Sequence, residues 1–264
     1  MIIMTQDIEK LIVQRVTSQV FIKGSSKMLK ITKNQLMILD AMMNQGGFTK
    51  KYEDKSKKLR YSEHIGMLDF NTYGLERIIV STRPSIEYDD DPEILLPDNP
   101  PDALDYEYIF HTHPPTPFPG GRAKDNVLYE FPSINDLYHF AEHFNQGNTQ
   151  GSIVIAPEGF YLISSSNKKI NIPPFDETYK KMINEVFEIQ LDAIEKYGIK
   201  YEKNPNLFYS KVAQDISYLK RFNKIIKKYW NNDINVLYKP RRKDKNGTWY
   251  IPSIYIPVNV IEPI

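Results

Sequence analysis

The stretch Phe110–Leu137, "FHTHPPTPFPGGRAKDNVLYEFPSINDL", gives the strongest indication of how this 264-residue chain folds. Its first part places His111 and His113 one residue apart, at the end of the strand-like segment "YEYIFHTHP". Side chains at i and i+2 of a strand lie on the same face, so both imidazoles can reach a single metal ion. Such a pair also arises by chance, and a strand histidine is often a packed residue. The pair alone therefore leaves both interpretations open.

The last part of the stretch, Ser133-x-x-Asp136, begins an expected amphipathic helix over 133–147. A serine followed three positions later by an acidic residue predicts a capping box at the helix start. A functional role for Asp136 is compatible with this cap, because the cap fixes where the carboxylate points. Two histidines and one carboxylate leave a tetrahedral zinc ion with one open position, which is typical of catalytic sites. His139 and His143 share the helix face of Asp136 and are expected to lie outside the ligand set.

Outside this stretch, strand and helix patterns alternate up to about residue 170, which predicts an α/β fold. A short strand is expected over 18–24, and the acidic, proline-broken segment 85–105 is expected to lie outside the core. After residue 172 the pattern changes to two long amphipathic helices and a strand pair, "INVLYKP" and "TWYIPSIYIPV". The sequence therefore predicts a domain over 1–172 and a helical extension over 173–264 that ends in a β-hairpin.

Composition excludes several classes of function. The formal net charge of +1 gives no reason to expect nucleic acid or membrane partners. The absence of cysteine excludes disulfides, thiolate zinc sites and a cysteine nucleophile. Asp7, Glu9 and Lys10 interrupt the apolar run that a signal peptide requires, and no apolar stretch reaches the roughly 18 residues needed to span a bilayer. An intracellular, cytoplasmic protein is expected.

A zinc site of this kind also needs a base for the attacking water and a donor for the developing oxyanion. Glu63 is the best candidate for the base, because it precedes an apolar strand in which Gly66 permits close backbone approach. Spacing alone favours an ordinary exposed glutamate at this position.

Three separated blocks of sequence resemble the JAMM motif of MPN-domain metalloproteases, and they occur in that family's order. The resemblance covers approximately residues 25–165. The blocks are Glu63-x-x-Gly66-x-Leu68, His111-Thr112-His113-Pro114 and Pro132-Ser133-x-x-Asp136-Leu137.

The resemblance implies an MPN fold, which is an α-β-α sandwich around a mixed sheet. It also implies one zinc ion bound by His111, His113 and Asp136. Glu63 would be the catalytic acid/base, and Ser133 would stabilise the tetrahedral intermediate. The implied reaction is hydrolysis of peptide or isopeptide bonds, with ubiquitin or a ubiquitin-like protein as the substrate.

Two alternatives stay open at this point. The first is a weakly active or inactive MPN scaffold within a larger assembly, with the acidic segment 85–105 and the extension 173–264 as contact surfaces for protein partners. The second is an amidohydrolase that acts on a substrate other than ubiquitin.

One departure from the family concerns the loop between the second and third ligands. The 19 residues between His113 and Ser133 exceed the length that the family usually has. Prolines stiffen the first half of the loop, and Gly120-Gly121 offers a pivot. Residues 115–130 are therefore expected to form a lid over the substrate cleft. The alternative is a structural brace for Asp136.

Overall fold

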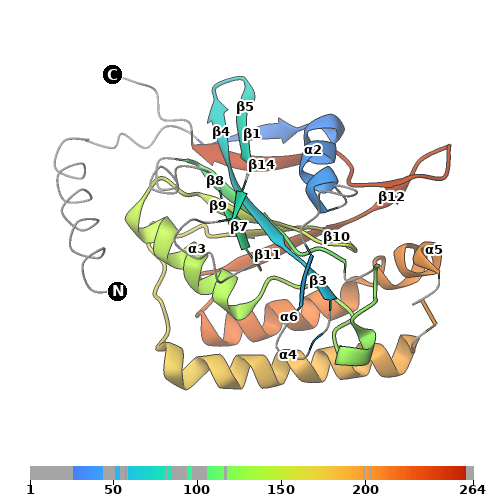
Figure 1. Cartoon of the computed structure of the whole chain (residues 1–264). Coiled ribbons are helices and arrows are strands. Elements are labelled where there is room, and N and C mark those ends of the chain that lie inside the picture. The colour runs from blue at the N-terminus through green and yellow to red at the C-terminus, as the bar shows by residue number, and fades with distance from the viewer. Residues whose placement is uncertain are drawn as a thin grey trace.

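A mixed β-sheet lies at the centre of the structure, with helices on both of its faces (Figure 1). The computed structural model describes residues 26–43, 51–53, 57, 59–80, 83–84, 94–96, 106–115, 118–198, 200–201 and 204–259. The strand expected over 18–24 lies outside these residues.

The strands are β1 (Ser26–Ile31), β2 (Lys51–Glu53), β3 (Leu59–Tyr61), β4 (Glu63–Asn71), β5 (Gly74–Val80), β6 (Arg83–Pro84), β7 (Ile94–Leu96), β8 (Tyr108–Thr112), β9 (Gly151–Ile155), β10 (Gly159–Ser164), β11 (Asn235–Pro240), β12 (Arg242–Lys243), β13 (Trp249–Tyr250) and β14 (Ile254–Asn259). The α-helices are α2 (Lys33–Met43), α3 (Ile134–Gln146), α4 (Phe175–Tyr197), α5 (Pro205–Leu207) and α6 (Ile216–Tyr229). A 3₁₀ turn spans Ala123–Asp125, and a π-helical turn spans Phe208–Val212.

The central sheet has the strand order β11-β10-β9-β8-β4-β7-β6, and β5 also pairs with β4. The pairs β8–β9 and β4–β7 are parallel, and the other neighbours are antiparallel. β1 and β14 form a separate antiparallel ribbon. The expected mixed α/β architecture is therefore present.

Both faces of the sheet are buried at β9, which explains its three successive apolar residues, Ile153–Ile155. Val154 faces the core beneath α3, α4 and α6, whereas Ile153 and Ile155 face the core beneath α2 and the β1–β14 ribbon. β10 alternates in the same way, with Tyr161 and Ile163 on the first side. A strand covered on both faces needs apolar side chains at successive positions rather than at every second one.

Gly66 in β4 is required by close packing at the centre of the sheet. A Cβ atom at this position would lie 2.2 Å from the carbonyl oxygen of Ile79 in β5 and 2.4 Å from the ring of Phe110 in β8. Any larger side chain would push apart the strands that carry Glu63 and His111. The glycine of the first sequence block therefore has a packing role close to the candidate site.

The segment after residue 173 differs in two ways from the expected pair of helices and terminal hairpin. The second helix is not continuous, because α5 and the π-helical turn precede α6, which begins at Asp215 as N-cap. The two long strands do not pair with each other either: β11 adds to the central sheet beside β10, and β14 pairs with β1. Only the short strands β12 and β13 form the expected hairpin.

The proline-broken segment 85–105, which the sequence predicts to lie outside the core, contributes the short strand β7 to the sheet. Within it, β7 pairs in parallel with the start of β4, at Glu63 and His64. Its other residues lie outside the described part of the chain.

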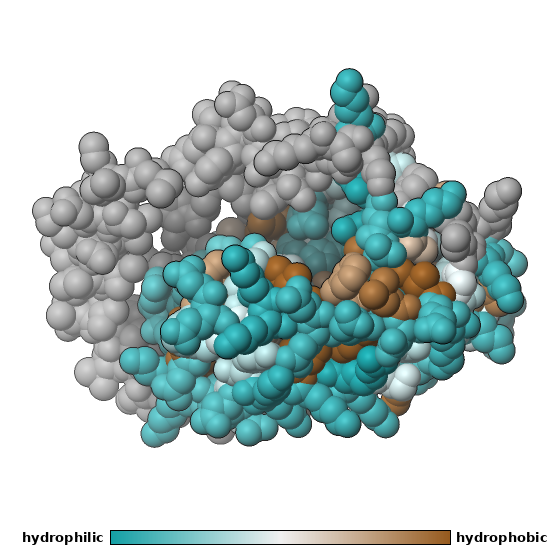
Figure 2. Space-filling view, turned by 90° about the horizontal axis from the view of Figure 1, so that it is seen from below, coloured by the Kyte–Doolittle hydropathy of each residue, from teal (hydrophilic) through white to brown (hydrophobic). Residues whose placement is uncertain are grey.

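The surface formed by α4 is mostly hydrophilic, with some exposed apolar side chains (Figure 2). The exposed apolar residues of α4 are Phe175, Ile183 and Phe187. Among the described helices, none has the length and hydropathy needed to cross a bilayer.

Candidate metal centre

β8 positions the two histidines at the centre of the sheet. His111 lies opposite Ile65 of β4 on one side and Val154 of β9 on the other. The backbone N–H of His113 donates to the carbonyl of Ile155 at 2.8 Å, which continues the β8–β9 ladder one step past the end of the strand. Both residues are buried, each with 8% of its surface exposed.

Three side chains converge from β8 and α3, as expected from the sequence. The Nε2 atoms of His111 and His113 are 3.1 Å apart. The Oδ2 atom of Asp136 lies 3.3 Å from Nε2 of His111 and 3.5 Å from Nε2 of His113. Within the described ranges, this is the group of His, Asp and Glu side chains whose ligand atoms are close enough to hold one metal ion.

The predicted capping box is present and holds Asp136 in place. Ser133 is the N-cap of α3, and its hydroxyl oxygen accepts from the backbone N–H of Asp136 at 3.1 Å. In return, Oδ2 of Asp136 accepts from the backbone N–H of Ser133 at 2.6 Å. The oxygen that closes the cap is the same one that faces the histidines, so the start of α3 and the contact with the histidines depend on one carboxylate.

A backbone carbonyl orients the ring of His113. Nδ1 of this ring lies 3.1 Å from the carbonyl oxygen of Glu130. A carbonyl can only accept, so Nδ1 carries a hydrogen, and Nε2 is the ring atom that faces Asp136 and His111. A histidine ligand usually donates its second ring N–H to a group of this kind.

The electrostatics of the site favour a positive charge. Burial by itself lowers the pKa of His113, but the carboxylates of Glu63, Asp136 and Glu130 outweigh it and raise that pKa to about 10. Burial likewise raises the pKa of Asp136, but the two histidines hold it well below its ordinary value. A cation at this point is therefore stabilised by several carboxylates.

Glu63 and Ser133 also lie at the site. Glu63 is the first residue of β4 and lies two positions before Ile65, which is directly opposite His111. Alternation along β4 therefore places Glu63 on the sheet face of the histidines. Its carboxylate raises the pKa of His113, so the two groups interact electrostatically. His139 is exposed on α3 and lies 4.0 Å from Glu142, away from the ligand group.

The described part of the long loop between His113 and Ser133 is a packed segment. Gly120, the expected pivot, has φ of +74°, and a Cβ there would lie 3.1 Å from the ring of Phe208 and 3.2 Å from that of Tyr201. Further along the loop, Leu128 and Tyr129 are buried. The loop therefore packs against the chain that follows residue 173, and its Glu130 carbonyl contacts His113.

Two residues near the site, Glu130 and Glu158, belong to no sequence motif that would predict their position there. Glu130 acts on His113 through its backbone carbonyl, and a carbonyl is present at every position. Glu158, in the turn between β9 and β10, is fully buried. Its Oε1 accepts from the hydroxyl of Tyr161 at 2.7 Å, and Oε2 has no partner among the described residues.

Glu158 gives the first testable prediction. Burial raises its pKa from 4.5 to about 7. Between pH 4.5 and pH 7 the Glu158 carboxyl is ionised in the unfolded chain but protonated in the folded protein. Its contribution to the free energy of unfolding of the wild type therefore falls as pH rises through this window. Glu158→Gln has no such charge and should not show this fall. The free energy of unfolding of Glu158→Gln minus that of the wild type should therefore increase by about 3 kcal/mol between pH 4 and pH 8.

Urea unfolding of the metal-free proteins at pH 4, 6 and 8 measures this difference. The exposed Glu142→Gln serves as a control and should follow the wild-type curve. Parallel curves for the wild type and Glu158→Gln would show that the Glu158 carboxyl is solvated in the folded protein.

Comparison with known proteins gives one close similarity. No family model and no solved structure matches the chain. Its sequence is 35% identical over 238 residues to the uncharacterized protein R413 of Acanthamoeba polyphaga mimivirus. The match covers 86% of the present chain and 65% of the viral protein, so the chain spans less than two thirds of that relative's length.

Proposed function

We propose that the chain is a zinc-dependent hydrolase of the JAMM type with an MPN fold. It would cleave peptide or isopeptide bonds, with ubiquitin or a ubiquitin-like protein as the substrate. The observation that carries this proposal is the triangle formed by two imidazole nitrogens and one carboxylate oxygen, with Glu63 beside it on the neighbouring strand.

The spacing of the three donor atoms supports zinc. In a tetrahedral zinc site with bonds of about 2.0–2.1 Å, adjacent ligand atoms lie about 3.3–3.4 Å apart. The distances between the donor atoms of His111, His113 and Asp136 are 3.1, 3.3 and 3.5 Å. Imidazole ligands also favour zinc and neighbouring transition metals over magnesium or calcium. Bound zinc would supply Lewis acidity, which lowers the pKa of a water molecule and polarises a substrate carbonyl.

Glu63 is the proton carrier in this proposal. Its carboxylate accepts a proton from the attacking water and later delivers it to the leaving amine. The position of Glu63 on β4 suits this role, because it shares the sheet face of the histidines without belonging to the group of three donor atoms.

Ser133 would stabilise the oxyanion. Its hydroxyl oxygen accepts from the backbone N–H of Asp136, which leaves the hydroxyl hydrogen available to donate to a substrate oxygen. Ser133 is exposed at the N-terminus of α3, where the helix dipole also favours negative charge.

The proposal is tested by assaying the purified chain, with and without one equivalent of zinc, against three groups of substrates. These are ubiquitin chains of different linkages, conjugates of ubiquitin-like proteins, and unmodified peptides. We expect zinc-dependent cleavage of at least one isopeptide substrate. Stoichiometric zinc binding without cleavage of any substrate would contradict the proposed hydrolase and support a scaffold role.

A further inference from the structure

The amide side chain of Gln190 in α4 binds the backbone of the inserted loop directly beside Glu130. Oε1 of Gln190 accepts from the N–H groups of Leu128 and Tyr129, both at 3.0 Å. Its Nε2 donates to the carbonyl of Tyr129 at 2.7 Å. Gln190 is 6% exposed, so these three bonds form away from water. A buried amide with both of its ends bonded is costly to remove, because it leaves backbone groups unsatisfied.

These bonds fix the peptide next to the one that contacts the metal centre. Nε2 of Gln190 holds the carbonyl of Tyr129, and the following carbonyl, that of Glu130, meets Nδ1 of His113. The path from α4 to the imidazole thus consists of two hydrogen bonds and one residue of backbone. No flexible side chain intervenes between Tyr129 and the carbonyl of Glu130.

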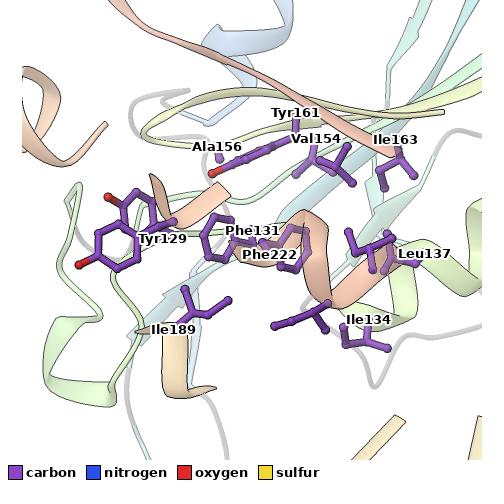
Figure 3. Close-up of a cluster of buried hydrophobic side chains, with 14 of the residues drawn as sticks. Tyr129, Phe131, Ile134, Leu137, Val154, Ala156, Tyr161, Ile163, Ile189 and Phe222 are labelled. Atoms are coloured by element: carbon purple, nitrogen blue, oxygen red, sulfur yellow. The ribbon is translucent and has the colours of Figure 1, made fainter. Parts of the chain in front are cut away.

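Other contacts restrain both sides of the same short segment. The hydroxyl of Tyr129 donates to the carbonyl of Val212 at 2.9 Å. The ring of Phe131 stacks on Phe222 of α6, with ring centroids 4.7 Å apart. Figure 3 shows Tyr129, Phe131 and Phe222 together in the buried cluster between the sheet and the helices. Arg122 holds the side chain of Glu130 through an ion pair of 2.6 Å.

We propose that Gln190 is a positioning residue for the metal centre, acting through the backbone of Tyr129 and Glu130 to orient the imidazole of His113. This inference rests on the proposed function for the identity of the metal, but the hydrogen bonds that carry it involve only the chain itself. It makes the segment after residue 173 part of the metal centre, because α4 supplies the group that orients a ligand located nearly 80 residues earlier.

The matched comparison is between Gln190→Met and Asn223→Leu. Methionine keeps the length of the glutamine side chain and removes its three hydrogen bonds. Asn223 in α6 binds a backbone segment in a similar way, since its Nδ2 donates to the carbonyl of Val236 at 2.7 Å and its Oδ1 accepts from the N–H of Val236 at 3.0 Å. Val236 belongs to β11, which carries no residue of the metal centre.

Two measurements are made on each full-length variant. Competition with a chelator gives the zinc affinity, which we expect to fall about 10-fold or more in Gln190→Met and by less than about two-fold in Asn223→Leu. In the metal-free protein, NMR detects the Nδ1–H of His113, which should be protected from exchange in the wild type and in Asn223→Leu. That protection should be lost in Gln190→Met.

Equal losses of zinc affinity in the two variants, or an unchanged Nδ1–H signal in Gln190→Met, would overturn the positioning role. If the wild-type protein binds no zinc, the proposed function fails, and the NMR signal alone decides whether Gln190 orients His113. Should Gln190→Met fail to fold, Gln190→Glu replaces it, because an ionised carboxylate still accepts from Leu128 and Tyr129, whereas its second oxygen repels the carbonyl of Tyr129 instead of donating to it. Its zinc affinity is then expected below that of the wild type, and wild-type affinity would contradict the proposal.

Discussion

Replacing Asp136 with asparagine is expected to weaken zinc binding by at least roughly 100-fold, because groups that merely orient a ligand already contribute 10- to 100-fold. The asparagine side chain keeps an oxygen that can accept from the N–H of Ser133, so the start of α3 is preserved. What it loses is the negative charge that faces His111 and His113 at 3.3 and 3.5 Å. Zinc content after dialysis and chelator competition both measure this loss.

Two controls separate the ligand role of Asp136 from its capping role. Ser133→Ala removes the hydroxyl that accepts from Asp136 and should cost about 1 kcal/mol of stability while the metal stays bound. His139→Ala alters an exposed histidine one turn along the same helix and should keep both stability and zinc. Retention of zinc in Asp136→Asn together with its loss in His139→Ala would assign the third ligand to His139.

Much of the candidate site is predictable because its parts are encoded locally. The i, i+2 spacing of His111 and His113 is a property of any strand, and the Ser133–Asp136 cap is a property of a helix start. Each pattern fixes the direction of its own side chains over a few residues. The convergence of these side chains on one point depends on the tertiary fold. The order of the three sequence blocks, which matches that of the JAMM motif, predicts this convergence.

The remaining features depend on contacts between distant residues or on backbone groups. Gln190 meets Tyr129 across 61 residues, and a single glutamine on an amphipathic helix carries no signal of that contact. β14 pairs with β1, which lies at the opposite end of the described chain. The residues of the two last long strands contain no information about this distant partner, so their sequence alone predicts that they pair with each other. The packing of the loop is also nonlocal, because the rings of Phe208 and Tyr201 lie against Gly120 and no pattern within residues 115–130 predicts those contacts.

Replacing Glu63 with glutamine is expected to lower kcat by roughly 10²–10⁴-fold, the usual contribution of a positioned proton-transfer group. Glutamine has nearly the same shape as glutamate, so the pairing of β4 with β7 and β8 is preserved. It cannot accept a proton from water at neutral pH, however, and the leaving amine would depart without a proton donor. KM should change little, because Glu63 is proposed to move a proton and not to bind the substrate.

Zinc affinity and a matched glutamate variant distinguish this role from that of a ligand. Glu63→Gln should retain stoichiometric zinc, because the donor atoms of His111, His113 and Asp136 form the group without it. Glu76→Gln changes an exposed glutamate on the neighbouring strand β5 and should leave kcat, KM and zinc content unchanged. A Glu63→Gln protein that loses its zinc would make Glu63 a fourth ligand. One that keeps both zinc and full turnover would remove it from the reaction, and the proton would then have to be carried by another group near the site.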